Sequence, residues 1–393
     1  PRTDEDRDWE DILPVRQWLY QTPEQILIKA SNGASDFGNK FGQPLITGSV
    51  LTFEHQENGE RYGYDKVIML AGGVGYGTKR DCLKGTPQKG NKVVVVGGDN
   101  YRIGLGGGSV SSVDTGRYSS GIELNAVQRA NPEMQKRANN LVRALCEEDV
   151  NPVVSIHDHG SAGHVNCLSE LVEECGGLID MSKLPIGDKT LSSKEIIANE
   201  SQERMGLLIQ EEHIEHVRKI AERERAPMYV VGETTGDAHF AFQQADGVRP
   251  FDLDVAQMFG HSPKTYMRDN TVERKYEDVT YDETKLNEYV ARVLCLEAVA
   301  CKDWLTNKVD RSVTGKVARQ QCQGEIQLPL SDCGVVALDY RGKAGIATAI
   351  GHAPQAGLAD PAAGSVLSVA ESLTNIVWAP LAEGLDSVSL SAN

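Results

Sequence analysis

A carboxylate followed by glycines marks the strongest candidate site in the sequence. Asp158 lies in the string HDHGSAG, His157–Gly163, directly after the apolar run Pro152–Ile156. In layered α/β domains, ligands gather beyond the carboxyl ends of strands. A carboxylate there suits Mg²⁺ beside a phosphate, because glycines let backbone N–H groups face anionic oxygens. The alternatives are a turn in which Asp158 caps the next helix, and a transition-metal site on His157 and His159, which the lack of a third soft ligand disfavours.

Two further strings offer polar groups or backbone to a ligand. NESQER, Asn199–Arg204, lies between apolar residues and could hydrogen-bond a polar substrate, or it could form a solvated helix face. GLGGGS, Gly104–Ser109, could cradle a phosphate, but it matches neither the P-loop nor the full dinucleotide fingerprint, so a flexible turn is equally compatible with it. Neither string identifies a ligand on its own.

A second candidate site lies near the end of the chain. Glu371 and Asn375 occur four residues apart in SVAESLTNIVW, and helical periodicity places them on one face. Hard oxygen ligands at this spacing suit Mg²⁺, and Asp332 could complete the site. The alternative is an exposed polar stripe. No convincing Ser–His–Asp or Cys–His arrangement is present, so the sequence indicates no catalytic nucleophile.

The elements that must position these residues follow from hydrophobic patterning. Buried strands are predicted at Lys92–Val96, Pro152–Ile156 and Pro227–Val231, and helices at Asn131–Glu148, Ser169–Cys175 and Leu207–Arg225. This alternation indicates an α/β layered domain. Outside it we predict a helix at Trp9–Tyr20, a loop at 31–49, a hairpin of Ser49–His55 and Arg61–Leu70, helices at Leu286–Leu305 and Ala363–Trp378, and strands at Gly324–Leu330, Gly334–Asp339, Ala344–Ala349 and Val388–Ser391.

Composition narrows the class of protein. The 393 residues include 40 Lys and Arg against 56 Asp and Glu, a formal charge of −16, which argues against a nucleic-acid partner. The longest apolar runs are too short to span a membrane, and the charged opening PRTDEDRDWE is unlike a secretory signal. The eight cysteines form no CxxC pair, so zinc is disfavoured and buried free thiols in a reducing cytoplasm are predicted.

Ordered strings along essentially the whole chain resemble one family. They are KFGQPLITG, IMLAGGVG, RIGLGGGSVSS, VQRANPEMQKR, IHDHGSAGH, ANESQERM, DRSVTGKVARQQCQG and ESLTNI…LSAN. Their order resembles the synthetase region of the long-chain formylglycinamide ribonucleotide amidotransferases. The resemblance implies an α/β (α+β layered) fold with partly duplicated N- and C-terminal domains like those of aminoimidazole ribonucleotide synthetase. It predicts the end of a first N-terminal domain at 1–88, a C-terminal domain at 89–247, a linker at 248–284 and a truncated second N-terminal domain at 285–393.

The resemblance also implies roles for single residues. These are a catalytic Mg²⁺ ligand at Asp158, substrate contacts at Gln128, Glu200, Ser201 and Gln202, ATP contacts at Thr47, Gly48, Ser49 and Ser331, and Mg²⁺ ligands of a second, noncatalytic nucleotide site at Asp332, Glu371 and Asn375. The chain also departs from the family. Members often have a hydrophobic residue where His159 stands and Gly–Leu where Gly163–His164 stand, which leaves the shape of this loop open.

The implied activity is that of an ATP-dependent C–N ligase of purine biosynthesis in the cytoplasm. ATP would phosphorylate the amide oxygen of formylglycinamide ribonucleotide, and ammonia from a glutaminase domain of the same polypeptide would displace the phosphate. The family's catalytic histidine and glutaminase triad match nothing in these residues, so no catalytic residue is expected here and the isolated stretch is expected to be inactive. Two alternatives are another ATP-dependent synthetase of the same superfamily, and a scaffold that binds nucleotide and Mg²⁺ structurally.

Overall fold

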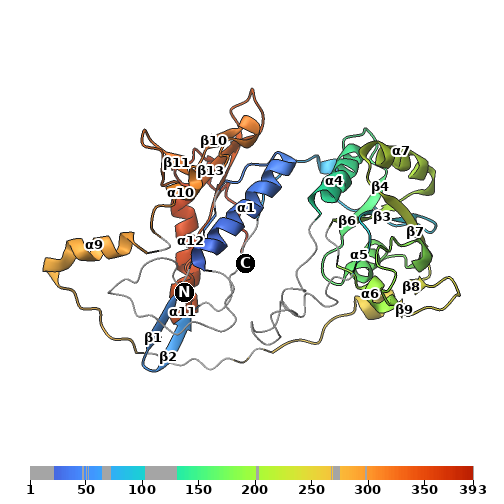
Figure 1. Cartoon of the computed structure of the whole chain (residues 1–393), viewed down its shortest axis with the longest axis horizontal. Helices are drawn as coiled ribbons and strands as arrows, with labels where there is room; N and C mark the ends of the chain where they lie inside the picture. Colours follow the sequence, from blue (N-terminus) through green and yellow to red (C-terminus); the bar gives the residue numbers. More distant parts are fainter. Residues whose placement is uncertain are drawn as a thin grey trace. The chain divides into compact units, whose positions relative to one another are not determined.

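The computed structural model divides into two compact units (Figure 1). It describes residues 22–46, 48–49, 51, 53–63, 72–101, 131–200, 203–266, 268, 275–296 and 299–392. Unit one comprises Pro1–Tyr76 and Val272–Asn393, and unit two comprises Gly77–Thr271. The domain limits predicted from the family resemblance stay a prediction.

Unit two is organised around one mixed sheet. Among its described residues the sheet has seven strands in the order β4-β6-β3-β7-β5-β8-β9. They are β3 (Lys92–Gly97), β4 (Val153–Asp158), β5 (Gly177–Asp180), β6 (Arg204–Ile209), β7 (Met228–Thr234), β8 (His239–Gln243) and β9 (Phe251–Asp254). β5 and β8 are parallel, and the other neighbouring strands are antiparallel.

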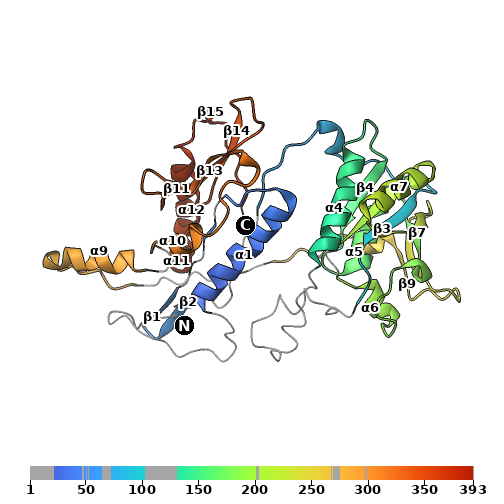
Figure 2. The ribbon, with the colours of Figure 1, turned by 45° about the horizontal axis from the view of Figure 1, so that its top comes forward.

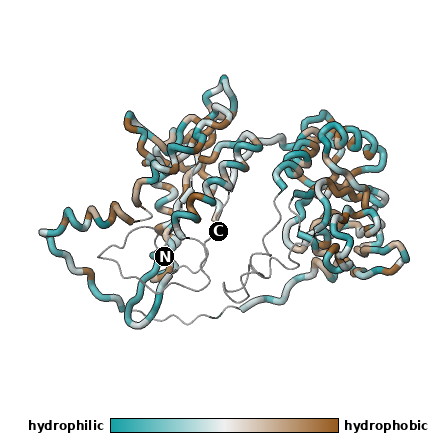
Figure 3. Tube along the Cα trace, viewed as in Figure 1, coloured by the Kyte–Doolittle hydropathy of each residue, from teal (hydrophilic) through white to brown (hydrophobic). Residues whose placement is uncertain are grey.

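Helices cover both faces of this sheet (Figure 2). They are α4 (Pro132–Cys146), α5 (Gly163–Leu171), α6 (Ser193–Ile197), α7 (Ile214–Glu224) and α8 (Val255–Met258), with 3₁₀ turns η1 (Lys79–Asp81), η2 (Met181–Lys183) and η3 (Glu211–His213). Val94 and Val96 of β3 pack with α4 and α7, whereas Val93 and Val95 pack with α5 and α6. Because both faces of β3 are buried, its sequence is a continuous apolar run rather than an alternating one. In Figure 3 the hydrophobic residues of unit two gather in these strands.

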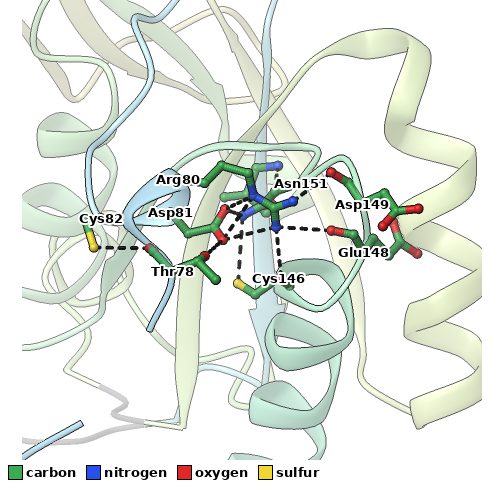
Figure 4. A network of polar contacts seen from close by, with 9 residues as sticks. Thr78, Arg80, Asp81, Cys82, Cys146, Glu148, Asp149 and Asn151 are labelled. Atoms are coloured by element: carbon green, nitrogen blue, oxygen red, sulfur yellow. Dashed lines mark hydrogen bonds and ion pairs between the residues drawn. The ribbon is translucent and has the colours of Figure 1, made fainter. Parts of the chain in front are cut away.

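A polar network attaches the first residues of unit two to the end of α4 (Figure 4). The guanidinium of Arg80 donates hydrogen bonds to the backbone carbonyls of Cys146, Glu148 and Asp149 at 3.2, 3.1 and 2.7 Å, respectively. It therefore satisfies carbonyls that the helix end leaves without partners. The side chain of Arg80 also donates a hydrogen bond to Asp81. This bond is the largest of several that lower the pKa of Asp81 to about 2. The segment 77–88 is thus an ordered part of unit two.

Two helix predictions in unit two are wrong. The helix predicted at Ser169–Cys175 is α5, which begins earlier, at Gly163, and ends at Leu171. The first residues of the helix predicted at Leu207–Arg225 belong to β6, and the helix α7 starts only at Ile214. A short apolar run in a central strand cannot be distinguished by periodicity from a segment of a buried helix. This explains why the residues of β6 were assigned to a helix. Strands β3, β4 and β7 and helix α4 are confirmed within one to three residues at each end.

Unit one contains a small sheet with helices packed on it. The sheet is β10 (Val317–Arg319), β13 (Cys333–Ala337) and β14 (Gly345–Ala349), all antiparallel. The other elements are α1 (Pro23–Phe41), α9 (Leu286–Leu294), α10 (Asp303–Thr306), α11 (Pro354–Ala359), α12 (Pro361–Ile376), β1 (Glu54–Glu57), β2 (Glu60–Gly63), β11 (Cys322–Gln323), β12 (Leu328–Pro329), β15 (Ala382–Leu385), η4 (Glu283–Lys285) and η5 (Val313–Gly315). Helix α12 contacts β14 and is capped by Asp360, whose carboxylate accepts from the N–H groups of Ala362 and Ala363.

The loop predicted at 31–49 is wrong, because most of it is helix. Thr22 and Gln25 form a reciprocal capping box that starts α1, and Gly42, with φ of 68°, ends it. Good caps at both ends offset the cost of glycines inside the helix, about 1 kcal/mol each. A Cβ on Gly38 would lie 2.3 Å from the carbonyl oxygen of Gln43, so this glycine is required by the returning chain.

The remaining unit-one predictions have mixed outcomes. Strands β13 and β14 and helix α12 are confirmed in position. A hairpin is present, but its first strand is Glu54–Glu57 rather than Ser49–His55; its second strand, Glu60–Gly63, covers the start of the predicted one, of which 64–70 lie outside the described residues. The single helix predicted at Leu286–Leu305 is two helices, α9 and α10, the strand predicted at Gly324–Leu330 is mostly a turn, and 388–391 forms no strand. Residues 9–20 lie outside the described residues.

Two sequence expectations concern the whole chain. All eight cysteines are free, but four of them, Cys82, Cys146, Cys295 and Cys301, are exposed, so the prediction of buried thiols is wrong for half of them. No helix in the described parts of the chain combines the length and apolarity needed to cross a membrane.

Candidate functional site

The strings singled out in the sequence meet at one edge of the unit-two sheet. β3 and β4 flank β6 and are both antiparallel to it, so they run in the same direction. Their carboxyl ends are Gly97, opposite Arg204, and Asp158, opposite Met205. The HDHGSAG string after β4, the NESQER string before β6 and the segment after β3 therefore emerge at the same edge.

The loop after β4 folds back over the carboxylate of Asp158. A Cβ on Gly160 would lie 2.7 Å from Asp158 Oδ1, and Asp158 itself is exposed. Ala162 has a φ of 63°, which costs about 1–2 kcal/mol for a residue with a side chain. Backbone strain of this kind clusters at ligand sites and is maintained by the surrounding structure. The loop thus has a fixed, strained shape around an accessible carboxylate.

The loop after β4 contacts the NESQER string directly. The N–H of Ala162 donates to Glu200 Oε1 at 3.2 Å. A Cβ on Gly163 would lie 2.0 Å from the backbone oxygen of Asn199, so only glycine permits this approach. The predicted Mg²⁺ ligand Asp158 and the predicted substrate contact Glu200, which is buried, are therefore brought to neighbouring loops.

A buried polar cluster that the sequence reasoning missed lies beneath these loops. Asn100, His159, His164, Asn199 and Arg204 are at most 1% exposed. Burial is the largest cause that lowers the pKa of His159 and His164 well below the usual value, and the charge of Arg204 lowers both further. Burial also lowers the pKa of Arg204 to about 10. The two histidines are thus neutral, and Arg204 remains a cation at neutral pH.

Unit one brings a second set of predicted residues together. Ser49 Oγ lies 2.9 Å from His352 Nε2, and Glu371 Oε2 accepts the backbone N–H of His352 at 2.7 Å. Asn375 Nδ2 donates to the carbonyl of Ile350 at 3.0 Å. The expectation that Glu371 and Asn375 share one helix face is confirmed, because both contact the segment that follows β14.

Asp332 and Ser331 lie beside this segment. The last pair of the β13–β14 ladder is Cys333 opposite Ala349, so Asp332 precedes β13 at the end where Ile350 follows β14. The hydroxyl of Ser331 donates to the carbonyl of Cys333 at 3.0 Å and accepts from Arg319 at 3.1 Å. No hydrogen bond to the backbone carbonyl of Ser331 is found among the described residues, which leaves this oxygen open to a contact.

Several predicted residues cannot be placed. Thr47, Gln128, Ser201, Gln202 and the 104–109 glycine run lie outside the described residues. Gly48 is described, and a Cβ there would meet open space.

Comparison with known proteins decides the family. Residues 88–244 match the model of the AIR synthase related protein, C-terminal domain, and residues 301–393 match the FGAR-AT PurM_N-like domain. Phosphoribosylformylglycinamidine synthase of Dictyostelium discoideum is 41% identical over 385 residues, which cover 94% of this chain and 28% of that protein. The Homo sapiens protein of the same name is 38% identical, over 98% of this chain and 30% of that protein.

The chain belongs to the phosphoribosylformylglycinamidine synthase family. It spans less than a third of the length of these curated relatives.

Solved structures share the fold of this family member. "T. maritima PurL complexed with FGAR" aligns with a TM-score of 0.58 at 18% identity, covering 87% of this chain and 51% of that one. "T. maritima PurL complexed with ATP" aligns with a TM-score of 0.58 at 17% identity, covering 88% and 50%. At this identity the likeness shows the fold alone, and it confirms the predicted synthetase-like α/β architecture.

The predicted metal ligands in unit one are hard oxygen donors, which suit Mg²⁺ better than a transition metal. Among the described residues, no group of three or more His, Cys, Asp or Glu could hold a metal ion. Glu371 Oε1 and Asn375 Oδ1 accept no hydrogen bond from the described part of the chain, so both are available as hard oxygen ligands. Asp332 would add a third hard oxygen, the kind of ligand that Mg²⁺ takes beside waters and phosphate oxygens.

Asp158 offers one exposed carboxylate in unit two. One carboxylate can be enough to hold Mg²⁺ when waters and the phosphate oxygens of a substrate supply its other ligands. The neighbouring histidines have other partners. His157 forms an ion pair with Glu170, and His159 faces His164. They do not converge on a shared ion.

Proposed function

We propose that this chain supplies part of the synthetase region of a phosphoribosylformylglycinamidine synthase, acting in the cytoplasm as an ATP-dependent C–N ligase. The full polypeptide would convert formylglycinamide ribonucleotide (FGAR), glutamine, ATP and water to formylglycinamidine ribonucleotide, glutamate, ADP and phosphate. Its partners would be these small molecules and the remaining domains of the same polypeptide, including a glutaminase domain. Neither a nucleic acid nor a membrane is part of the proposal.

The observation that carries the proposal is the contact between the Asp158 loop and Glu200. The hydrogen bond from Ala162 N–H to Glu200 Oε1 joins the string expected to hold Mg²⁺ to the string expected to hold FGAR. Phosphoryl transfer depends mainly on positioning and charge stabilisation, so these two functions must lie side by side. The identity of about 40% to synthases along nearly the whole chain supports the same assignment.

The chemistry can be written as two balanced steps. The amide oxygen of FGAR takes the γ-phosphoryl group of ATP, and ADP leaves. Ammonia then attacks the activated carbon, and phosphate leaves with the former amide oxygen. Mg²⁺, when bound at Asp158, would screen charge among the phosphates and the substrate. Glu200, with Gln128, Ser201 and Gln202, would orient the ribonucleotide.

Unit one would hold a second nucleotide that does not react. Gly48 and Ser49, with Thr47, would contact its phosphates, and Ser331 would contact it through its carbonyl. Asp332, Glu371 and Asn375 would hold its Mg²⁺. The joining of Ser49 to Glu371 through His352 supports one common site. If the chain bound ADP and Mg²⁺ here but FGAR nowhere, the alternative of a nucleotide-binding scaffold would be favoured.

The domain division also remains our proposal, with limits at 1–88, 89–247, 248–284 and 285–393. Within the proposed linker, β9 and α8 belong to unit two, because β9 pairs with β8. The family models that match residues 88–244 and 301–393 support the second and fourth of these domains.

Replacing Asp158 with Asn in the full polypeptide tests the proposal. The amide keeps the shape of the side chain but removes the charge that would hold Mg²⁺. We expect kcat to fall by about a hundredfold or more, with the KM for FGAR changed less than about threefold, because the contact is used mainly in the transition state. Steady-state kinetics with FGAR, ATP and ammonia measure both. An unchanged kcat would refute the role of Asp158.

A further inference from the structure

Three segments of unit two that carry the proposed site are joined by one buried network. Arg204 Nη1 lies 3.0 Å from His164 Nε2, and Arg204 Nη2 donates to the backbone oxygen and to Oδ1 of Asn199 at 2.8 and 2.9 Å. His164 Nδ1 lies 2.9 Å from His159 Nε2, and Asn100 Oδ1 lies 3.2 Å from His164 Nε2. The side-chain N–H of Asn199 also donates to the backbone oxygen of Tyr101, in the segment after β3, at 2.5 Å. The network thus links the segment after β3, the loop after β4 and the segment before β6.

The hydrogen-bond directions along this network are determined by Arg204. A guanidinium has donors only, so the hydrogen bond from Arg204 requires His164 Nε2 to accept. Asn100 Oδ1, which is also an acceptor, then packs beside this nitrogen without a hydrogen bond to it. The proton of the neutral His164 ring then resides on Nδ1, which donates to His159 Nε2, and the proton of His159 resides on its Nδ1. One buried cation therefore fixes the tautomer of both rings, and with it their orientation.

The network is unusual in its position as well as its burial. A buried cation is costly unless its hydrogen bonds are made. Here neutral groups accept from Nη1 and Nη2 of Arg204, while Nε has no partner among the described residues. Its members directly adjoin the proposed functional groups, since His159 follows Asp158 and Asn199 precedes Glu200. The rings of His159 and His164 also pack edge to face, with their centroids 4.7 Å apart.

We propose that His164 and Arg204 are positioning residues that hold the Asp158 loop and the Asn199–Glu200 segment in register. This inference rests on the proposed function. Neither side chain touches substrate, and both act through the loops that they join. Removing side chains that orient functional groups without contacting the ligand commonly changes activity by about 10–100-fold. A displaced loop costs turnover more than binding, because the reacting groups must be aligned to within a fraction of an ångström.

The test compares two variants of α5 in the full polypeptide. His164→Leu breaks the network at its centre, and Leu171→Ala damages the core beneath the same helix without touching the network. We expect His164→Leu to lower kcat by about 10–100-fold with the KM for FGAR within about threefold. Leu171→Ala should lower the melting temperature comparably and leave kcat within about twofold. His164→Asn, which retains a donor and an acceptor, should recover most of the lost kcat.

A second readout does not depend on activity. Hydrogen exchange at the Ala162 amide, which donates to Glu200, should become faster in His164→Leu and remain unchanged in Leu171→Ala. If His164→Leu does not fold, His159→Leu removes the other ring of the hydrogen-bonded pair, with the same two readouts expected at smaller amplitude.

Equal kcat and equal exchange in the network and control variants would overturn the inference. This failure differs from failure of the proposed function. In that case Asp158→Asn itself would retain full turnover, whatever the His164 variants do.

Discussion

The two units differ in how much of their apolar surface they bury by themselves. Almost all fully buried hydrophobic side chains among the described residues belong to unit two, in two clusters on the opposite faces of its sheet. Unit one leaves large apolar side chains exposed, such as Val366 on α12 at 69% and Leu286 on α9 at 64%. Unit two therefore has the core of an independently stable domain, whereas unit one has apolar faces that the described residues do not cover.

The two candidate sites differ in the same way. In unit two a buried network fixes the loops before any ligand arrives. In unit one Ser49, His352 and Glu371 are exposed or half-buried, and single hydrogen bonds join them. A preorganised site suits chemistry that needs alignment, and an adaptable one suits binding without chemistry. This contrast agrees with the proposal of a reacting nucleotide at unit two and a nonreacting one at unit one.

The largest expected effect is that of Gly163→Ala in unit two. The added Cβ would meet the backbone of Asn199, and the residue already has a φ of 56°. Since neither backbone can yield without breaking the loop contact, we expect a loss of about 2–4 kcal/mol in the free energy of unfolding of unit two. Hydrogen exchange of the β3 amides measures it. All four tryptophans, at positions 9, 18, 304 and 378, belong to unit one and report on that unit separately.

Gly247→Ala is the matched control. Gly247 also has a positive φ, 87°, but a Cβ there would meet open space. It should cost only the conformational strain, about 1 kcal/mol. If both variants lost the same stability, the close approach of the two loops would not be a constraint, and the claim of a preorganised site would fail.

How much of this fold the sequence could predict depends on where the decisive contacts are. β3 was predictable because an uninterrupted run of valines is typical of a strand whose two faces are both buried. Helix α1 was missed because its evidence lies at its ends, in the Thr22–Gln25 capping box, while glycines inside it indicate a loop. β5 and β8 were missed because each is only four or five residues long and lies beside turns.

The site was predictable only in part for a similar reason. Asp158, Glu371 and Asn375 were identified because strand ends and helical spacing are local signals. His164 and Arg204 lie 40 residues apart, and their contact depends on β6 folding between β3 and β4. Both residues belong to polar strings that flank predicted strands, and a histidine and a cation in such strings could have been noticed. Their spacing in the sequence, however, does not indicate that they contact each other.

Acid should destabilise unit two through its buried histidines. The folded state holds His159 and His164 neutral, with pKa values well below normal, whereas in the unfolded chain both titrate near about 6.5. Below that pH the unfolded state binds more protons, so the stability of unit two should fall progressively as the pH drops below about 6.5. The contribution of Asp81 is lost separately, as the pH falls from 3.8 toward about 2. Urea unfolding at a series of pH values, followed by hydrogen exchange of β3, measures this loss.

The double variant His159→Gln, His164→Asn provides the control for acid sensitivity. Its amides keep hydrogen-bonding capacity but do not titrate, so the slope of stability against pH between about 6.5 and 5 should flatten. An unaltered slope would mean that other groups cause the acid loss and that the histidine pair is not held neutral by the fold.

The smallest effect is expected in unit one, from Ser49→Ala. The hydroxyl makes an exposed hydrogen bond to His352, whose loss should weaken binding of ADP with Mg²⁺ by only about two- to tenfold, since such a bond contributes about 0.5–1.5 kcal/mol. Calorimetric titration of the full polypeptide measures it, with Ser365→Ala as the control because Ser365 bonds only within its own helix. Glu371→Ala should reduce the affinity further, since it removes a proposed ligand. If Ser49→Ala abolished ADP binding outright, unit one would depend on a single preformed contact, and its distinction from the site of unit two would disappear.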